Sequence, residues 1–184
     1  MPRVALLVID FQHGLIVGPP AAHQADATLA VLNAAIGTAR AQGWPVIFVR
    51  HEDADELPRD SAKWALHSGL DARSGDLYIA KTACDSFLDT PLQAELAARQ
   101  VDSLLIGGYA TEFCIDTSVR SAAARGYRVT VLEDGHTTQD RPHLSAGSIR
   151  MHHAWVWARL SAPGPVTVQP LQRCLAALAS SDGK

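Results

Sequence analysis

The chain has 184 residues, 47% of them hydrophobic and 19% charged, and its formal net charge at pH 7 is -3. This length and composition predict one globular domain spanning residues 1–184 and exclude a disordered chain. The weakly acidic balance offers no positive patch for nucleic acid or an anionic membrane, and no apolar run is long enough for a signal segment or a membrane span, so we expect a cytoplasmic protein.

Short apolar segments alternate with helical patterns along the chain. Segments that are apolar at nearly every position predict strands over residues 4–9, 44–49, 77–81, 103–108, 127–133 and 165–169. Helical spacing of apolar residues predicts helices over residues 27–42, 91–100, 111–125, 144–160 and 171–179. Residues 50–76 are polar with weak periodicity, and we expect a loop with some helix there.

The apolar strands determine the predicted fold class. Strands without polar alternation are buried on both faces, which requires a parallel sheet covered by helices on each side. We therefore predict an α/β fold with three layers, in which a six-stranded, mainly parallel sheet is doubly wound in the Rossmann-like manner. Right-handed crossovers place all the strand carboxyl ends along one edge, where such folds bind ligands.

Three residue types suited to catalysis meet at that predicted edge. Asp10 follows the first strand, Lys81 ends the third, and Cys114 lies just after the fourth. Each alone has an ordinary explanation, since an aspartate often caps a helix, a lysine is usually solvated and a cysteine usually fills a core. Their convergence on one edge favours a catalytic site.

Cys114 has a local context that the other two thiols lack. Thr111 is placed to cap the helix start, and Cys114 then falls near the third helical position, where the helix dipole lowers a thiol pKa. The Gly107–Gly108 pair allows a tight turn before it. Cys174 lies on an apolar helix face and is expected to pack, and Cys84 is a weaker candidate for the reactive thiol. Three cysteines at unrelated spacings argue against a disulfide framework and a structural zinc site.

Three segments resemble a known family. They are "ALLVIDFQHGL", "IAKTACDSF" and "IGGYATEFCIDTSVRSAAARGYRVTVLEDGHTT". They resemble the motifs of the isochorismatase-like cysteine hydrolases, which include nicotinamidases and N-carbamoylsarcosine amidohydrolases. The resemblance implies a triad of Asp10, Lys81 and Cys114 that cleaves amide-like C–N bonds of a small molecule through an acyl-enzyme. It also implies a homodimer or a larger homo-oligomer.

The same resemblance implies details of the site. It places a non-prolyl cis peptide at Tyr109–Ala110 and an oxyanion hole at the amides of Ala110 and Cys114. Nicotinamidases of the family carry an Asp-x-His metal motif after the second strand, but here Val49 stands in place of the aspartate. His51 and His67 alone are a poor zinc set, so we expect no metal and no other cofactor. True isochorismatases generally lack the cysteine, which favours an amidase.

Four aromatic residues are candidates for the substrate pocket. Phe11, Phe87 and Phe113 are close in sequence to the proposed catalytic residues, and Trp64 lies in the polar loop that we expect to cover the pocket. Core packing explains each of them equally well.

Other functions are compatible with the sequence. Cys114 paired with His136 and Asp134 would form a Cys-His-Asp arrangement. An isochorismatase-type hydrolase of a non-amide substrate and a non-catalytic small-molecule-binding domain are further alternatives. A nucleotide-binding module is disfavoured, because "GGYATEFC" lacks the G-x-G-x-x-G pattern and no phosphate loop occurs elsewhere.

Overall fold

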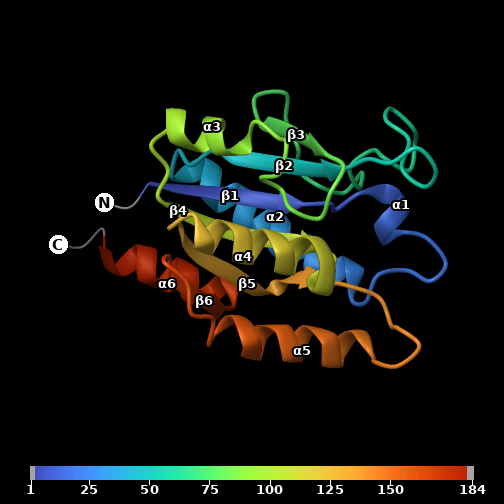
Figure 1. Ribbon diagram of the computed structural model, residues 1–184. Coiled ribbons are helices and arrows are strands. Elements are labelled where there is room, and N and C mark those ends of the chain that lie inside the picture. The colour runs from blue at the N-terminus through green and yellow to red at the C-terminus, as the bar shows by residue number, and fades with distance from the viewer. Residues whose placement is uncertain (1–2, 182–184) are drawn as a thin grey trace.

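A computed structural model describes residues 3–181 and contains a six-stranded sheet with helices on both faces (Figure 1). Every strand pair is parallel, and the strand order is β3-β2-β1-β4-β5-β6. The strands are β1 Val4–Ile9, β2 Val46–His51, β3 Leu77–Lys81, β4 Ser103–Tyr109, β5 Arg128–Thr137 and β6 Val166–Gln169. The predicted fold class is confirmed, and the sheet is parallel throughout.

The helices divide between the two faces of the sheet. They are α1 His13–Ile16, α2 Ala25–Ala41, α3 Leu92–Ala98, η1 Thr111–Ile115, α4 Asp116–Ala124, α5 Ala146–Trp157 and α6 Leu171–Ser181. One buried cluster joins α3, α4 and α5 to one face, and a second joins α2 and the start of α6 to the other. In Figure 1, α4 lies in front of the sheet and α2 behind it.

The strand β1 shows why the core has two halves. Alternate side chains of a strand point to opposite faces, so Ala5, Leu7 and Ile9 pack in the first cluster and Leu6 and Val8 in the second. All five are fully buried. A strand that contributes to both layers has no position for a polar side chain, which explains its unbroken apolar sequence.

Three segments differ from the sequence-based expectation. Residues 52–76 contain no helix or strand, because turns and side-chain bonds such as those of Asp53 hold this loop instead. The short helix α1 follows β1 and was not predicted. Strand β5 continues to Thr137 past an irregularity opposite Ile106–Gly108, so His136, which lies beyond the predicted end of the strand at residue 133, is a strand residue.

Gly108 is required by the close approach of two strands. Its φ is +128°, and a Cβ at this position would lie 1.9 Å from the Ile9 carbonyl oxygen. A larger residue would therefore push β4 away from β1 just before the turn that carries Cys114. Within residues 3–181, no helix is long and apolar enough to cross a membrane.

Candidate active site

Asp10, Lys81 and Cys114 come from three separate elements and meet at the carboxyl edge of the sheet. The Lys81 ammonium lies 2.7 Å from Asp10 Oδ2 and 3.2 Å from Cys114 Sγ. All three side chains are buried: Asp10 is 1% exposed, Lys81 2% and Cys114 9%. Removing these charged groups from water costs free energy of folding unless the opposite charges compensate one another.

The strand order explains how Lys81 reaches Asp10. Strand β2 separates β3 from β1, so the long lysine side chain crosses the end of β2. The residue at that end is His51, which is the register partner of Lys81, and its Nδ1 lies 3.3 Å from the ammonium. The ammonium also donates to the Ala83 carbonyl at 3.0 Å. Three N–H donors thus serve four acceptors, so a change in charge at any one of them redistributes the bonds.

Asp10 is held in a conformation that few residues adopt. Its φ is +50°, in the left-handed region that aspartate tolerates better than most side chains. Its amide donates to the Val49 carbonyl at 2.8 Å, which ties the turn to β2. Lys81 occupies Oδ2, and Oδ1 is buried without a hydrogen-bond partner. This oxygen is therefore free to accept a proton.

Cys114 lies in a π-helical turn that continues directly into α4. The expected cap at Thr111 is wrong: the residue that precedes the turn is Ala110, and no side chain caps it. The Thr111 hydroxyl instead contacts His136 Nδ1 at 2.9 Å and the Thr137 carbonyl at 3.2 Å, because β5 extends beside it. Cys114 is consequently the fourth residue of the helical segment and not the third.

The backbone before Cys114 contains a cis peptide bond at Tyr109–Ala110, where the resemblance places one. The Ala110 carbonyl accepts bonds from the amides of Phe113 and Ile115. Within residues 3–181, the Ala110 amide itself donates to no protein acceptor. A buried, uncommitted amide next to the thiol is a donor that a reacting carbonyl oxygen could use.

The protonation of the thiol differs from the expectation. Burial raises the pKa of Cys114, the Asp10 carboxylate raises it further, and the Lys81 charge opposes both. The expected lowering by the helix start is therefore not found, because desolvation has the largest influence on this pKa and the Asp10 carboxylate adds to it. For Lys81, burial alone lowers the pKa, but the Asp10 carboxylate, with a smaller contribution from the Cys114 sulfur, holds it above its ordinary value. The resting site thus contains a lysine cation and a protonated thiol.

One group of potential metal ligands coincides with this site. Donor atoms of Asp10, His51 and Cys114 lie within 4.8 Å of one another. The Lys81 ammonium contacts all three residues, so it already supplies the positive charge that a metal ion would bring. His67 does not belong to this group; its ring packs against Phe11 and its Nδ1 accepts from the Gly69 amide.

The alternative pairing of Cys114 with His136 and Asp134 is not formed. His136 contacts Thr111, and Asp134 accepts from the Leu171 amide. Burial lowers the pKa of His136 to about 3, and the Arg150 cation and the ring of His153 contribute. A histidine with so low a pKa is a poor general base for a thiol.

The aromatic candidates divide into packed and exposed residues. Phe11 is fully buried in one core cluster, and Phe87 is buried in the other and stacks on Tyr127. Trp64 is also buried, with the Arg50 guanidinium 3.6 Å above its ring. Phe113 is 51% exposed. Phe11 and Phe87 thus match the core-packing alternative, whereas Phe113 remains available to a ligand.

Gln12, a residue that holds the carboxyl edge of the sheet in place, was not identified from the sequence. Gln12 is fully buried, and its amide donates to the carbonyls of His51 and Trp64 while accepting from the His51 amide. These bonds fix the end of β2 beneath Lys81. A glutamine after a strand resembles any surface residue, so only its buried contacts identify this role.

A cavity of about 570 Å³ lies beside Tyr109, the residue before the cis bond. Its lining also includes the charged side chains of Glu56, Lys63 and Arg141. Arg141 forms an ion pair with Glu112 at 2.6 Å. The cavity borders the residue before the cis bond, but Asp10, Lys81 and Cys114 do not line it.

Comparisons with known proteins identify the family and the fold. Residues 4–162 match the family model for the isochorismatase domain. A streptothricin hydrolase from Streptomyces noursei is 33% identical over 147 residues, covering 77% of this chain and 57% of that protein. The ureidoacrylate amidohydrolase RutB of Methylorubrum extorquens is 31% identical over 94 residues, or 51% of this chain and 38% of that protein.

A crystal structure of an isochorismatase family protein superposes with a TM-score of 0.85 at 36% identity, covering 92% of this chain and 99% of that one. By contrast, the chain spans only about half the length of the streptothricin hydrolases it matches.

Proposed function

This chain belongs to the isochorismatase family of hydrolases, and we propose that it is a cysteine amidohydrolase that cleaves a C–N bond of a small molecule through a thioester on Cys114. The observation that carries the proposal is the Lys81 ammonium between the Asp10 carboxylate and the Cys114 thiol. Two of the matched relatives bear the names streptothricin hydrolase and ureidoacrylate amidohydrolase, which supports hydrolysis and, for the second, an amide substrate.

Catalysis begins with the removal of a proton from the buried thiol. Because the pKa of Cys114 is raised by burial and by Asp10, the thiol is protonated at rest. Asp10 acts as the general base and takes the proton on Oδ1, which has no other partner. Lys81 stabilises the thiolate as it forms, since its N–H donors shift from the neutralised carboxyl to the sulfur.

The thiolate attacks the carbonyl carbon of the substrate. The tetrahedral oxyanion accepts hydrogen bonds from the Ala110 and Cys114 amides. The C–N bond then breaks as Asp10 returns its proton to the departing amine, leaving a thioester. A water molecule deprotonated by Asp10 hydrolyses the thioester, releasing the acid and restoring the thiol.

We infer that this reaction requires no metal ion or other cofactor. The potential metal ligands at the site already contact the Lys81 ammonium, and a divalent ion placed among them would be repelled by it. Turnover is therefore expected to be unchanged by a strong chelator. Loss of activity on chelation, with recovery on adding zinc or manganese, would contradict this part of the proposal.

The experiment that tests the function is a screen for amine release. Purified protein is offered small amides, ureas and lactams, and ammonia or the free amine is measured. Any substrate cleaved by the wild type is expected to be untouched by Cys114→Ala, with Cys84→Ala as the matched control that retains turnover. Equal activity in Cys114→Ala and the wild type would refute the proposal.

A further inference from the structure

The Lys81 ammonium has one more hydrogen-bond acceptor around it than it has protons to donate. It carries three N–H donors. The Asp10 carboxylate accepts at 2.7 Å and the Ala83 carbonyl at 3.0 Å. Two further acceptors remain, Cys114 Sγ at 3.2 Å and His51 Nδ1 at 3.3 Å. The Lys81 side chain is fully buried, so bulk water does not change this count. The third proton therefore lies between the sulfur and the imidazole.

The ring of His51 is held where it can accept this proton. His51 ends β2 as the register partner of Lys81 in β3. Its backbone amide and carbonyl both bond to the buried side chain of Gln12, which holds this strand end in place. One ring nitrogen lies within 4.8 Å of both the Cys114 sulfur and a carboxylate oxygen of Asp10. The imidazole thus faces the sulfur that the proposed reaction uses.

The charge on the sulfur decides which acceptor takes the third proton. The sulfur of a thiol or a thioester is a weak hydrogen-bond acceptor, whereas a thiolate is a strong, charge-assisted one. An ammonium donates and cannot accept, so the contact with His51 requires an Nδ1 that carries no proton and presents its lone pair. The third proton is therefore held by His51 while the sulfur is uncharged, and it moves to the sulfur when the thiolate forms.

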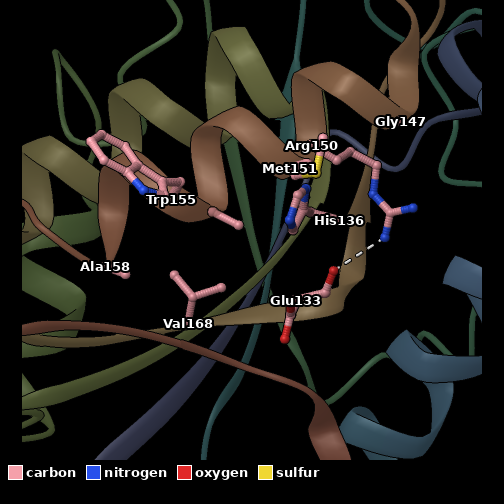
Figure 2. A pocket seen from close by; sticks show the side chains of 9 residues that line it. Glu133, His136, Gly147, Arg150, Met151, Trp155, Ala158 and Val168 are labelled. Atoms are coloured by element: carbon pink, nitrogen blue, oxygen red, sulfur yellow. Dashed lines mark hydrogen bonds between the residues drawn. The ribbon is translucent and has the colours of Figure 1, made fainter.

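The other histidine buried near this edge cannot take the place of His51. The Nδ1 atom of His136 contacts the Thr111 hydroxyl. Figure 2 shows the His136 ring beside Arg150 of α5, in a hollow of about 480 Å³ that Glu133 also lines. No residue of the Asp10–Lys81–Cys114 site lines this hollow. Within residues 3–181, His51 is the only histidine that contacts the Lys81 ammonium.

We propose that His51 is a positioning residue for the Cys114 sulfur: it accepts the third Lys81 proton while the sulfur is uncharged and yields this proton to the thiolate. His51 thereby stabilises the resting thiol and, during turnover, the thioester. Its task in turnover rests on the proposed function of this site. Its effect on the resting thiol does not, because Lys81 contacts both His51 and Cys114 without any substrate.

Alkylation by iodoacetamide tests the role of His51 without a substrate, because the thiolate is the reactive form of a cysteine. His51→Leu fills the position but offers no acceptor, so the third Lys81 proton is left with the sulfur alone. Cys114 should then be labelled roughly tenfold faster than in the wild type, the equivalent of one buried donor that has lost its partner. His51→Asn should be labelled at nearly the wild-type rate, since its Oδ1 stands at the same place in the side chain as Nδ1.

Two further variants separate the missing acceptor from easier access to the thiol. His51→Ala opens the approach more than leucine does, but His51 is half-buried, so water can enter and supply the acceptor. Alkylation should therefore be slower in His51→Ala than in His51→Leu; the opposite order would show that access decides. His152→Leu, at an exposed histidine of α5, should leave the rate unchanged. Circular dichroism checks that each variant is folded.

A folded His51→Leu variant that is labelled no faster than the wild type would overturn the proposal, and so would a His51→Asn variant that behaves like His51→Leu. Either result leaves the proposed amidohydrolase function standing. A wild type that cleaves no amide in the amine-release screen, while the variants are labelled in the expected order, would count against that function and support the role of His51.

Discussion

Lys81 and His136 are both basic, and both are almost completely buried near the carboxyl edge of the sheet, yet their surroundings differ. Lys81 contacts the Asp10 carboxylate and the Cys114 sulfur, and its pKa is raised despite burial. His136 contacts a neutral hydroxyl, and burial lowers its pKa to about 3. The neighbours, and not the depth of burial, decide which base keeps its charge. This difference favours a proton-transferring site at Lys81 and not at His136.

The largest expected effect comes from removing the Lys81 charge. Lys81→Met leaves Asp10 as a buried, unpaired carboxylate, which should lower the free energy of unfolding by about 3–5 kcal/mol. Urea denaturation measures this loss, and turnover should fall with it. The double variant Lys81→Met/Asp10→Asn should recover much of the stability, because no buried charge remains. If the double variant loses as much unfolding free energy as the two single variants together, Lys81 and Asp10 do not stabilise each other and this prediction is wrong.

A smaller effect distinguishes the two roles of Asp10. Asp10→Asn removes the general base and should lower turnover about a hundredfold or more. It also removes a carboxylate that raises the pKa of Cys114, and it leaves Lys81 to favour the thiolate. The thiolate fraction rises about tenfold for each unit by which that pKa falls, so iodoacetamide should label Cys114 faster in the variant.

Labelling and turnover should therefore change in opposite directions in Asp10→Asn. Peptide mass spectrometry resolves Cys114 from Cys84 and Cys174, which serve as internal controls. Slower labelling together with slower turnover would mean that Asp10 positions the thiol and does not act as its base.

The last effect, which is spread over several pH units, concerns His136 and the dependence of stability on pH. An unfolded histidine titrates at about 6.5, and His136 in the folded protein at about 3. Between these values the unfolded chain binds a proton that the folded chain does not. The free energy of unfolding should thus decrease as pH falls from about 6.5 towards 3, by at most about 1.4 kcal/mol per pH unit from this group.

His136→Asn should flatten this dependence relative to the wild type, and the exposed His152→Asn should not. Denaturation curves at several pH values provide the comparison. The His136 ring is buried against Thr111, Trp157, Arg150 and His153. If stability depends on pH equally steeply in His136→Asn and in the wild type, His136 is not the group that titrates.

The strand ends made much of the site predictable. A parallel sheet brings the ends of its strands to one edge, so Asp10, Lys81 and Cys114 could be assigned to the same edge from the sequence alone. The contact between His51 and Lys81 could not be predicted, because it depends on β2 lying between β1 and β3. The apolar pattern of the strands does not reveal the order of the strands in the sheet. The two core clusters followed from the same unbroken apolar strands.

Local rules failed where tertiary contacts competed with them. Thr111 has the residue type of a helix cap, but the extension of β5 gives its hydroxyl better partners in His136 and Thr137. The helix start suggested a lowered thiol pKa, but sequence alone does not reveal that Cys114 is buried beside a carboxylate. In both cases the deciding quantity was a distance between residues far apart in the chain.

The central claim is that Cys114 carries an acyl group during turnover. Intact-protein mass spectrometry of an acid-quenched reaction tests it most directly, using a substrate found in the amine-release screen. The account predicts a mass increase equal to the acyl part of the substrate, located on the peptide that contains Cys114 and absent from Cys114→Ala. A wild type that releases product with no adduct under single-turnover conditions, or an adduct on Cys84 or Cys174, would contradict it.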